Sequence, residues 1–545
     1  MPPLQVPSEE AEAEADEAAA VARGRAGAIR SAFEGVLPKE RFGDQRAILG
    51  GAAQNVVGLA FGAVAAAAAQ ILMSRTLGAE RYGIVTKAVQ LAFVGATATR
   101  FGMDVANIRL VAILIGRGQS GRIRGLVSRA ALIALSVSAV AAAAVFALAG
   151  TLAERLSELP GAARPAFMAA AVALPFAAMT QTYLGATRGL KIMRHTLYVF
   201  WIGQPLGWIA LTLAGWAIAT SAGMTVAAYA ASWGLASLVA WWAWERETRS
   251  FYGVTEEGGI PEEHTGALIR FGALRAPAAL FSHLVFWTDF YVASTMVSDR
   301  EAGVYAATLQ AGQTLFLFLT SLSLMFSPFV ADLHHRGERE KLDALYKSVT
   351  RWALTATIPV LLALAILPEQ VLRVFGSEFT GGSESLRILI LGMTVPVCVG
   401  TVGFILIMVG RTGWDLVVYL AAVGIDVGVA LVLARPQALG IRGAAIAQAV
   451  TLAFSAIARL LLVHRFVGIW PFDRHFVRLL PPAAIGAAAM VAVHALMPGE
   501  KWLLDLVVSG GVGAAAYAVA LLAMGLKPGE RGAVLAIARR VAGRT

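Results

Sequence analysis

Long apolar runs recur along almost the whole chain and constrain its fold more than any other feature. A helix needs about 20 mostly apolar residues to cross roughly 30 Å of hydrocarbon. The chain has 545 residues, 58% hydrophobic and 15% charged. A soluble domain is nearer about 45–50% apolar and about 25% charged. Because a single soluble core stops growing near about 250–300 residues, the sequence predicts an all-α polytopic membrane protein.

Fourteen membrane-spanning helices are expected. They lie near 50–74, 82–102, 126–150, 165–188, 196–219, 223–245, 268–297, 302–330, 351–373, 384–409, 413–434, 441–464, 476–497 and 503–526. The expected domains are a cytoplasmic tail without fixed structure (1–46), a six-helix bundle (47–250), a cytoplasmic linker (251–267), a second six-helix bundle (268–470), helices 13 and 14 (471–526) and a basic cytoplasmic tail (527–545).

The positive charges indicate how these helices are oriented. Most of the 45 lysines and arginines fall in alternate short loops and in the terminal segments, which places both termini in the cytoplasm. The net charge of +10 therefore reflects membrane orientation and not nucleic-acid binding. The acidic stretch "SEEAEAEADEAAA" is no signal peptide. Cys398 is the single cysteine, which excludes an internal disulfide and a cysteine-based metal site.

The chain repeats itself at an offset of about 220 residues, which is too long for a solenoid of roughly 20–50-residue units. "AERYGIVTKAVQ" at 79–90 aligns with "DREAGVYAATLQ" at 299–310, so that Gly83 falls on Gly303. A second echo joins "IGRGQSGRIRGLVSR" to "HHRGEREKLDALYKS". An even number of expected helices separates the copies, so both point the same way. The repeat predicts two bundles related by a two-fold axis along the membrane normal, with a substrate cavity between them.

Several helix-end segments resemble a known family. "ILMSRTLGAERYGIVTKAVQLAFVGATATRFGMDVANIRLVA", "FWTDFYVASTMVSDREAGVYAATLQ", "SLMFSPFVADLHHRGEREKLDALYKSVTRWAL", "ILPEQVLRVFGSEF" and "QALGIRGAAIAQAV" are similar to segments of the polysaccharide flippases. These belong to the multidrug/oligosaccharidyl-lipid/polysaccharide exporter superfamily, together with the O-antigen flippases. The resemblance covers residues 48–470 and carries no catalytic signature.

The resemblance implies a flippase in the bacterial cytoplasmic membrane. It would move an undecaprenyl-pyrophosphate-linked oligosaccharide between leaflets by alternating access, for lipopolysaccharide or other cell-surface polysaccharide synthesis. Its implied partners are this substrate, membrane lipids, a glycan polymerase and glycosyltransferases, with no cofactor and no nucleic acid. The alternative in the superfamily is a multidrug or cation antiporter, but those usually stop at twelve helices. A glycan polymerase or ligase is disfavoured because the outer loops are short, and no G-x-x-x-x-G-K-[ST] motif supports an ATP-driven pump.

One expected helix carries the main candidate site. A charge inside a bilayer costs about 2.5–3.5 kcal/mol on insertion scales, so it usually faces a cavity or a partner. Arg275, Ser282 and Asp289 recur every seven residues within 268–297, with His283 beside them. Arg275 would meet pyrophosphate, because a guanidinium presents several donors to phosphate oxygens. The alternative is a structural role, in which Asp289 and His283 form hydrogen bonds with neighbouring helices.

Coupling to a proton or sodium ion would use Asp289 or Asp426, although helix packing is the favoured role of Asp426. Arg100 either pairs with Asp104 or extends to the membrane interface. Arg75 either contacts substrate phosphate or anchors its helix. The remaining candidates are uncharged hydrogen-bonding residues that would line a sugar-binding cavity or bond across helices: Gln181, Gln204, Gln310 and Gln313.

Overall fold

The structure is a computed structural model that describes residues 42–249, 262–497 and 501–525. Residues 1–41 of the expected N-terminal tail, the basic tail at 527–545 and residues 251–261 of the expected linker lie outside these ranges, whereas α2 already begins at Phe42. The side chains of residues 42–60 and of several positions in two later helices, Arg275 among them, also lie outside the description. Every element of secondary structure in the described chain is helical.

Two groups of helices follow one another along the chain. The first contains α2 (Phe42–Thr99), α3 (Met103–Gly116), η1 (Ser120–Arg122), α4 (Ile123–Leu156), α5 (Pro160–Gly189), η2 (Thr196–Gly203), α6 (Gln204–Trp216) and α7 (Ala222–Glu247). The second contains α8 (Glu262–Leu284), α9 (Thr288–Ser294), α10 (Asp299–Gln313), α11 (Phe316–His335), α12 (Arg339–Ile366), α13 (Pro368–Arg373), η4 (Ser377–Gly382), α14 (Ser383–Val399), α15 (Val402–Met408), α16 (Thr412–Leu433), α17 (Ile441–Val467), η5 (Val477–Leu479), α18 (Leu480–Leu496), α19 (Trp502–Ala520) and η6 (Leu521–Gly525).

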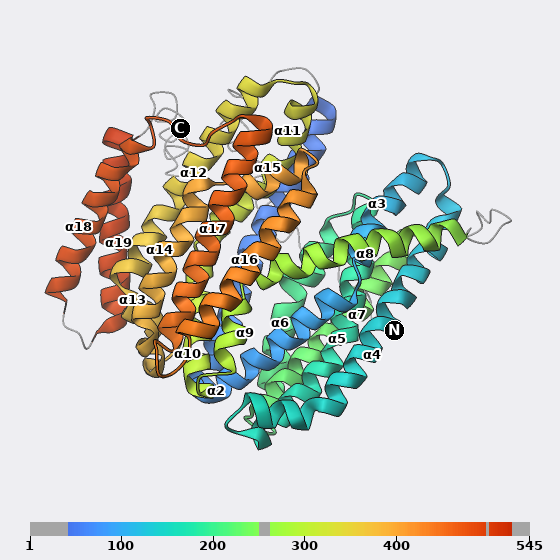
Figure 1. Cartoon of the computed structure of the whole chain (residues 1–545), viewed down its shortest axis with the longest axis horizontal. Helices are drawn as coiled ribbons and strands as arrows, with labels where there is room; N and C mark the ends of the chain where they lie inside the picture. Colours follow the sequence, from blue (N-terminus) through green and yellow to red (C-terminus); the bar gives the residue numbers. More distant parts are fainter. Residues whose placement is uncertain (1–41, 250–261, 498–500, 526–545) are drawn as a thin grey trace, which may run out of the picture.

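Figure 1 shows these groups side by side. Helices α3 to α7 (cyan to green) gather on one side, whereas α11 to α19 (yellow to red) gather on the other. The groups meet where α2, α9 and α10 lie together, near the bend of α2. We call this end of the molecule the Gly78 end. One large core of buried residues runs through it, from Tyr82 of α2 to Tyr305 of α10 and Phe379 of η4.

Ten helices in the described residues are long and apolar enough to cross a membrane, or eleven if the bent pair formed by α10 and α11 counts as one. This is fewer than the fourteen expected from the sequence. The first two expected helices form a single element, α2, whose two arms join at Gly78 with φ 75°. A left-handed backbone at this bend suits glycine, which has no Cβ to clash.

The expected helix at 268–297 is not continuous, which corrects one sequence prediction. Helix α8 ends at Leu284 and α9 begins at Thr288, so Asp289 does not share a helix face with Arg275 and Ser282. The first turn of any helix has backbone N–H groups without a partner inside the helix. At the break, the N–H of Asp289 donates to Asp426 Oδ2 on α16, at 3.0 Å. A tertiary cap thus stabilises the new helix start.

The glycines aligned by the sequence repeat cross each other in the structure. A Cβ added to Gly83 would lie 2.9 Å from the backbone nitrogen of Gly303. A Cβ added to Gly303 would lie 3.0 Å from the backbone nitrogen of Gly83. Each would also collide with a backbone oxygen on the other helix, Asp299 O for Gly83 and Ala79 O for Gly303. These contacts are reciprocal, as a two-fold axis passing between α2 and α10 would produce.

Candidate functional site

A large cavity, of about 490 Å³, lies mainly among helices of the second group. Its lining comes from α8, α10, α11, the α14–α15 junction, α16 and α17, and the first group contributes Ala63 and Trp201. A volume of this size falls within the roughly 300–1,000 Å³ typical of ligand pockets. The cavity is therefore large enough to hold a small molecule or the polar head of a larger one.

Aromatic side chains form much of the cavity wall: Trp201, Phe286, Trp287, Phe316, Phe404 and Tyr419. The polar lining includes His283, Gln313, Thr401 and Arg459. Among the described lining residues, Arg459 is the sole permanent charge and no carboxylate is present. Two sequence candidates, His283 and Gln313, thus lie at this cavity, and His283 stacks on Trp287 with 18° between the rings.

Arg459 is held in place on three sides. Its Nε donates to Asp415 Oδ1 at 2.7 Å, and its Nη1 donates to Ser455 Oγ. Its guanidinium lies 4.2 Å from the centre of the Tyr419 ring. Arg459 and Asp415 are only 9% and 5% exposed, so this is a buried pair. Nη2 has no hydrogen-bond partner. The geometry therefore fixes the guanidinium while leaving one nitrogen with unused donors.

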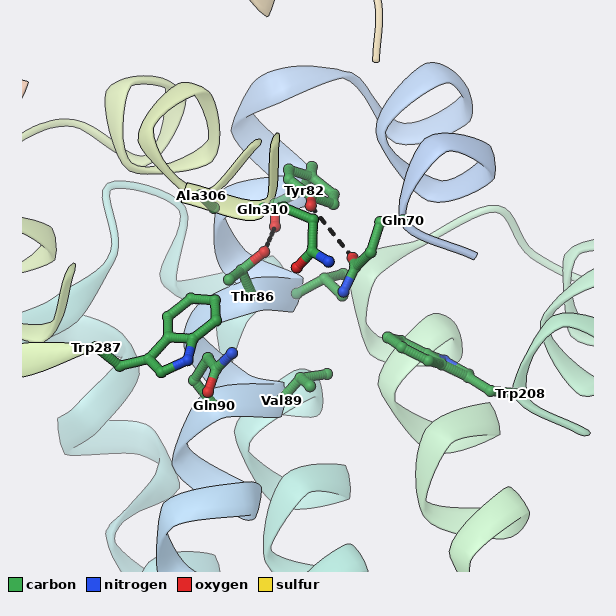
Figure 2. Close-up of a pocket in the computed structure, with 10 residues that line it drawn as sticks. Gln70, Tyr82, Thr86, Val89, Gln90, Trp208, Trp287, Ala306 and Gln310 are labelled. Atoms are coloured by element: carbon green, nitrogen blue, oxygen red, sulfur yellow. Dashed lines mark hydrogen bonds between the residues drawn. The ribbon is translucent and has the colours of Figure 1, made fainter. Parts of the chain in front are cut away.

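A second, much smaller pocket lies between α2, α6, α9 and α10 (Figure 2). Gln70, Gln90 and Gln310 line it, and Tyr82 donates to Gln70 Oε1 at 3.2 Å. Its volume of about 10 Å³ is close to that of one buried water. Gln310 therefore lines this small pocket between the two groups and not the large cavity. Gln90 and Gln310 are also equivalent in the sequence repeat.

The two carboxylates expected inside the helices meet each other. Asp289 and Asp426 are both completely buried. Asp289 N donates to Asp426 Oδ2, and Tyr305 donates its hydroxyl to Asp289 Oδ2. The second oxygen of each carboxylate makes no hydrogen bond of full geometry, although the Thr451 side chain interacts with Asp426. Neither aspartate lines the large cavity. The arrangement gives Asp426 the packing contact favoured for it, and it also leaves two buried acceptor oxygens without a full hydrogen bond.

Arg75 links the two groups at the Gly78 end. Its Nε donates to Val374 O at 2.7 Å, and its Nη2 donates to Arg373 O at 3.1 Å. Its guanidinium also lies 5.7 Å from the Trp502 ring centre. These contacts are those of a residue that anchors its helix.

The other candidates make local contacts. Arg100 pairs with Asp104 at 3.6 Å, although Gly102 separates α2 from α3 between them. Gln204 donates to Ser232 Oγ at 3.3 Å and so bonds across helices. Ser282 donates to the carbonyl of Ala279, one turn earlier. Gln181 is half-buried on α5 and lines neither of the two pockets described above.

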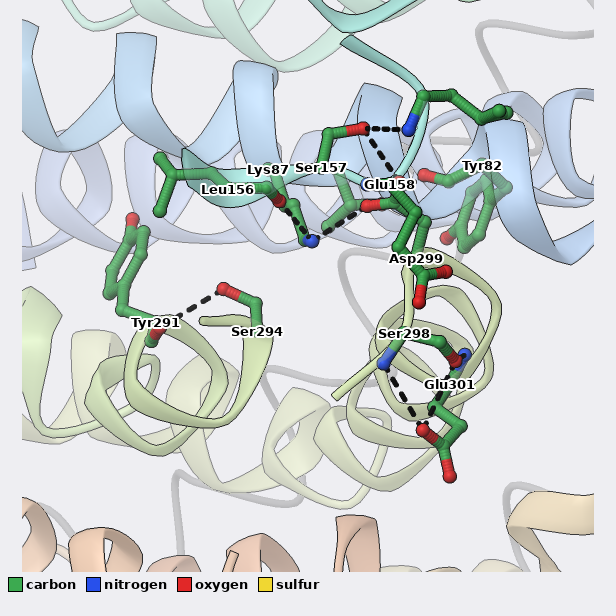
Figure 3. Close-up of polar contacts among 12 residues, drawn as sticks. Tyr82, Lys87, Leu156, Ser157, Glu158, Tyr291, Ser294, Ser298, Asp299 and Glu301 are labelled. Atoms are coloured by element: carbon green, nitrogen blue, oxygen red, sulfur yellow. Dashed lines mark hydrogen bonds and ion pairs between the residues drawn. The ribbon is translucent and has the colours of Figure 1, made fainter. Parts of the chain in front are cut away.

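The sequence reasoning missed a buried ion pair that joins the groups at the Gly78 end (Figure 3). Lys87 Nζ lies 2.7 Å from Asp299 Oδ1, and both side chains are at most 5% exposed. Asp299 Oδ2 also accepts from Ser157 Oγ at 2.6 Å and from the N–H of Glu158 at 2.8 Å. Lys87 Nζ donates in addition to Leu156 O at 2.6 Å. One carboxylate thus connects α2, the α4–α5 loop and α10.

No family model matches the sequence, and the search of curated proteins found no match. Solved structures do match. The lipid II flippase MurJ, in an inward closed conformation, aligns over 85% of this chain and 97% of its own, with TM-score 0.63 and 14% identity. An inward-facing multidrug resistance MATE family transporter of the MOP superfamily aligns over 74% of this chain and 94% of its own, with TM-score 0.61 and 15% identity.

This chain has the fold of the MOP superfamily transporters. A third match is a MOP superfamily transporter from Pyrococcus furiosus, with TM-score 0.56 and 16% identity over 77% of this chain and 95% of its own. A reverse polarity of its binding pocket suggested a different function for that protein. These structural neighbours are transporters and not enzymes, and the chain is a multi-pass membrane protein.

Proposed function

We propose that the protein is a flippase that moves a lipid-linked oligosaccharide across the membrane by alternating access. The observation that carries this proposal is the large cavity, whose described lining includes an arginine and no carboxylate. In an exporter of cationic drugs, we expect an acidic side chain in the cavity, because a buried cation needs a compensating charge. An anionic pyrophosphate-linked substrate is served by arginine, which binds phosphate oxygens through several N–H donors.

The MOP fold allows both kinds of substrate. The share of this chain that aligns with each structural neighbour favours a flippase. The lipid II flippase aligns over more of this chain than the MATE transporter does, 85% against 74%. The pair α18–α19 lies beyond the two bundles expected at 47–250 and 268–470. We infer fourteen crossings, counting two arms of α2, α8 with α9, and α10 with α11.

Orientation follows from the same proposal. Cytoplasmic termini place the Gly78 end on the outer side of a bacterial cytoplasmic membrane, because positive charges concentrate in the loops at the opposite end. The contacts of Gly83, Gly303, Lys87 and Asp299 then hold the outer side closed in this conformation. The oligosaccharide would enter from the cytoplasm, where glycosyltransferases complete it, and leave for a polymerase outside.

The proposed transport can be tested by reconstitution in liposomes with a fluorescent undecaprenyl-pyrophosphate-linked oligosaccharide. The wild-type protein is expected to move it between leaflets, and Arg275→Ala is expected to lower the rate at least about tenfold, the loss of a charged hydrogen bond to phosphate. Arg435→Ala is a suitable control, because its Nε only donates to Leu431 O at an exposed site. No movement by the wild type, together with efflux of a cationic dye such as ethidium, would instead identify a drug exporter.

Ion coupling would involve the Asp289–Asp426 pair. Two adjacent buried carboxylates repel each other when both are ionised, and each has one oxygen without a full hydrogen bond. A proton or a sodium ion bound between the two carboxylates would relieve this repulsion. In the conformation described, Tyr305 and the N–H of Asp289 already occupy the other two oxygens.

Asp289→Asn is therefore expected to uncouple transport while preserving the fold, because the amide oxygen still accepts from Tyr305. Transport driven by a proton or sodium gradient should fall to the rate without a gradient. Asp505→Asn is the control, since Asp505 is a buried carboxylate on α19 that lines neither pocket. Its partners are Ser509, Gln370 and His494. Gradient-driven transport at the wild-type rate in Asp289→Asn would remove this pair from the coupling mechanism.

A further inference from the structure

The α17–α18 linker, residues 468–479, joins two helices that are long and apolar enough to cross a membrane. It lies at the end of the molecule opposite the Gly78 end (Figure 1). Because both flanking helices enter the bilayer, the linker starts and ends at the membrane surface. Its sequence, "GIWPFDRHFVRL", places Trp470, Phe472 and Phe476 close to Arg474 and Arg478.

One side of the linker is fixed to the second group of helices. Ile469 is 1% exposed and belongs to a buried cluster that includes Tyr346 of α12. Pro471 is also buried. The N–H of Trp470 donates to Asp343 Oδ1 on α12 at 3.1 Å. These contacts hold the linker against α12, so its other side is a fixed surface.

This other side exposes aromatic and apolar side chains. Within 469–472, Trp470 and Phe472 are 36% and 37% exposed, while the other two residues are buried. Such alternation is that of an extended segment, whose successive side chains point to opposite sides. The rings of Trp470 and Phe472 lie 5.8 Å apart, and those of Phe472 and Phe476 lie 5.4 Å apart. Val477 then continues the apolar surface with 64% exposure.

The exposed charges of the linker are positive. Arg474 and Arg478 are exposed, and neither forms an ion pair with another described residue. Asp473, the one carboxylate of the linker, accepts a backbone N–H within the linker itself. Asp343, which contacts the linker from α12, pairs with Lys347. The nearby acidic groups therefore have partners of their own, and the two arginines remain available to an anion outside the protein.

The combination of exposed rings and exposed arginines defines the surroundings that suit this surface. Water alone would leave its apolar area unburied, and hydrocarbon alone would leave the arginines without counter-charges. The headgroup region of a membrane meets both needs, since aromatic rings are enriched there and basic residues are attracted to anionic headgroups. Segments with this composition typically lie in the plane of the membrane interface.

We propose that the α17–α18 linker is an interfacial surface that binds anionic phospholipid headgroups through Arg474 and Arg478. Trp470, Phe472 and Val477 lie among the headgroups and upper acyl chains of the same leaflet. Because the linker is also held against α12, the bound lipid fixes the start of α18 at the depth of the second group. The assignment of this leaflet to the cytoplasmic side rests on the proposed function, but the surface itself does not.

Fluorescence quenching by labelled lipids tests this proposal on the full-length protein. Cys398 is replaced by alanine, Val477 by cysteine, and a bimane is attached to the new cysteine. The protein is reconstituted in phosphatidylcholine vesicles that contain nitroxide-labelled phosphatidylglycerol or nitroxide-labelled phosphatidylcholine. At low salt the anionic lipid is expected to quench at least about threefold more efficiently, because one arginine near the surface contributes roughly fivefold to the affinity for anionic lipid. The preference should fall at about 1 M salt, where charges are screened within about 3 Å.

Two matched changes show whether the arginines cause this preference. Arg474→Gln combined with Arg478→Gln keeps polar side chains but removes both charges, and the preference should fall below about 1.5-fold. A label at Val512→Cys is the control, because Val512 is an exposed valine in the middle of α19 and residues 502–525 contain no lysine or arginine. This label should be quenched equally by the two lipids. Unchanged thermal unfolding of the double variant would show that its fold is intact.

The proposal is overturned if the two lipids quench the label at Val477→Cys equally, or if the double glutamine variant keeps the preference. Quenching by neither lipid would place the linker outside the membrane and would also overturn it. The outcome is independent of the transport assay. A preference for phosphatidylglycerol in a protein that moves no lipid-linked oligosaccharide would contradict the proposed function alone. Transport of the oligosaccharide without any lipid preference would contradict the interfacial surface alone.

Discussion

Replacing Lys87 by methionine is expected to open the Gly78 end of the molecule. Methionine keeps the length of the side chain but removes its charge, so Asp299 loses the cation that lies 2.7 Å away. Removing one partner of a buried ion pair typically costs about 3–5 kcal/mol. If the pair forms only while the two groups are closed at this end, that cost shifts the conformational equilibrium by about 10²-fold to several thousandfold.

Cysteine labelling measures this shift. Ser294 lines a third pocket, of about 390 Å³, that Lys87 and Asp299 also line. Because Ser294 is only 7% exposed, a cysteine there should react slowly in the closed conformation. Cys398, the single native cysteine, is first replaced by alanine. In Lys87→Met the introduced cysteine should react much faster with a membrane-impermeant maleimide, and transport should slow.

Two further variants separate loss of the pair from general unfolding. Lys87→Met combined with Asp299→Asn removes both charges, and replacing both partners usually costs much less than removing one. The double variant should therefore recover thermal stability relative to the single one. Arg300→Ala breaks an exposed pair with Glu378 at the same end and should cost at most about 1 kcal/mol. Equal labelling rates in Lys87→Met and the wild type would mean that the pair does not control opening.

The Lys87–Asp299 ion pair illustrates what the sequence can and cannot predict. Helix positions followed from local hydropathy, and ten of the expected helices have a counterpart among the apolar helices of the described chain. Lys87 stands inside an expected apolar helix, which was a visible signal of a buried charge. Its partner is 212 residues away and looks like an ordinary loop aspartate. Nothing local connects the two, because only the crossing of α2 and α10 brings them together.

Tertiary contacts also explain the other differences. The seven-residue spacing of Arg275, Ser282 and Asp289 predicts one polar helix face, but the cap from Asp426, 137 residues from Asp289, accompanies a helix break. In the sequence, Arg459 looks like one of the positive charges near helix ends that set the membrane orientation. In the structure it forms a buried ion pair with Asp415, 44 residues earlier. Sequence periodicity describes one helix at a time, whereas these features depend on the contact between helices.

Substitution of Gly83 by alanine is expected to destabilise the protein strongly. The added Cβ would collide with the backbone of Asp299 and Gly303, and a backbone cannot rotate away as a side chain can. The two helices would have to separate. Overpacking in a close-fitting core costs typically about 1–3 kcal/mol, and a clash with backbone on both sides should reach or exceed the upper value. Gly303→Ala should behave in the same way, because its contacts are the reciprocal ones.

Gly424→Ala provides the control. Gly424 lies inside α16 with no atom within 4 Å of the added Cβ, so alanine should be neutral or stabilise by up to about 1 kcal/mol through its higher helix propensity. Thermal unfolding of the detergent-purified proteins gives the comparison.

The separation forced at Gly83 should also weaken the ion pair, because Lys87 lies one turn after Gly83 and Asp299 one turn before Gly303. Gly83→Ala and Lys87→Met should therefore destabilise less in combination than the sum of their separate effects. Strict additivity would mean that the glycine crossing and the ion pair are independent contacts, and a stable Gly83→Ala protein would mean that α2 and α10 can move apart at little cost.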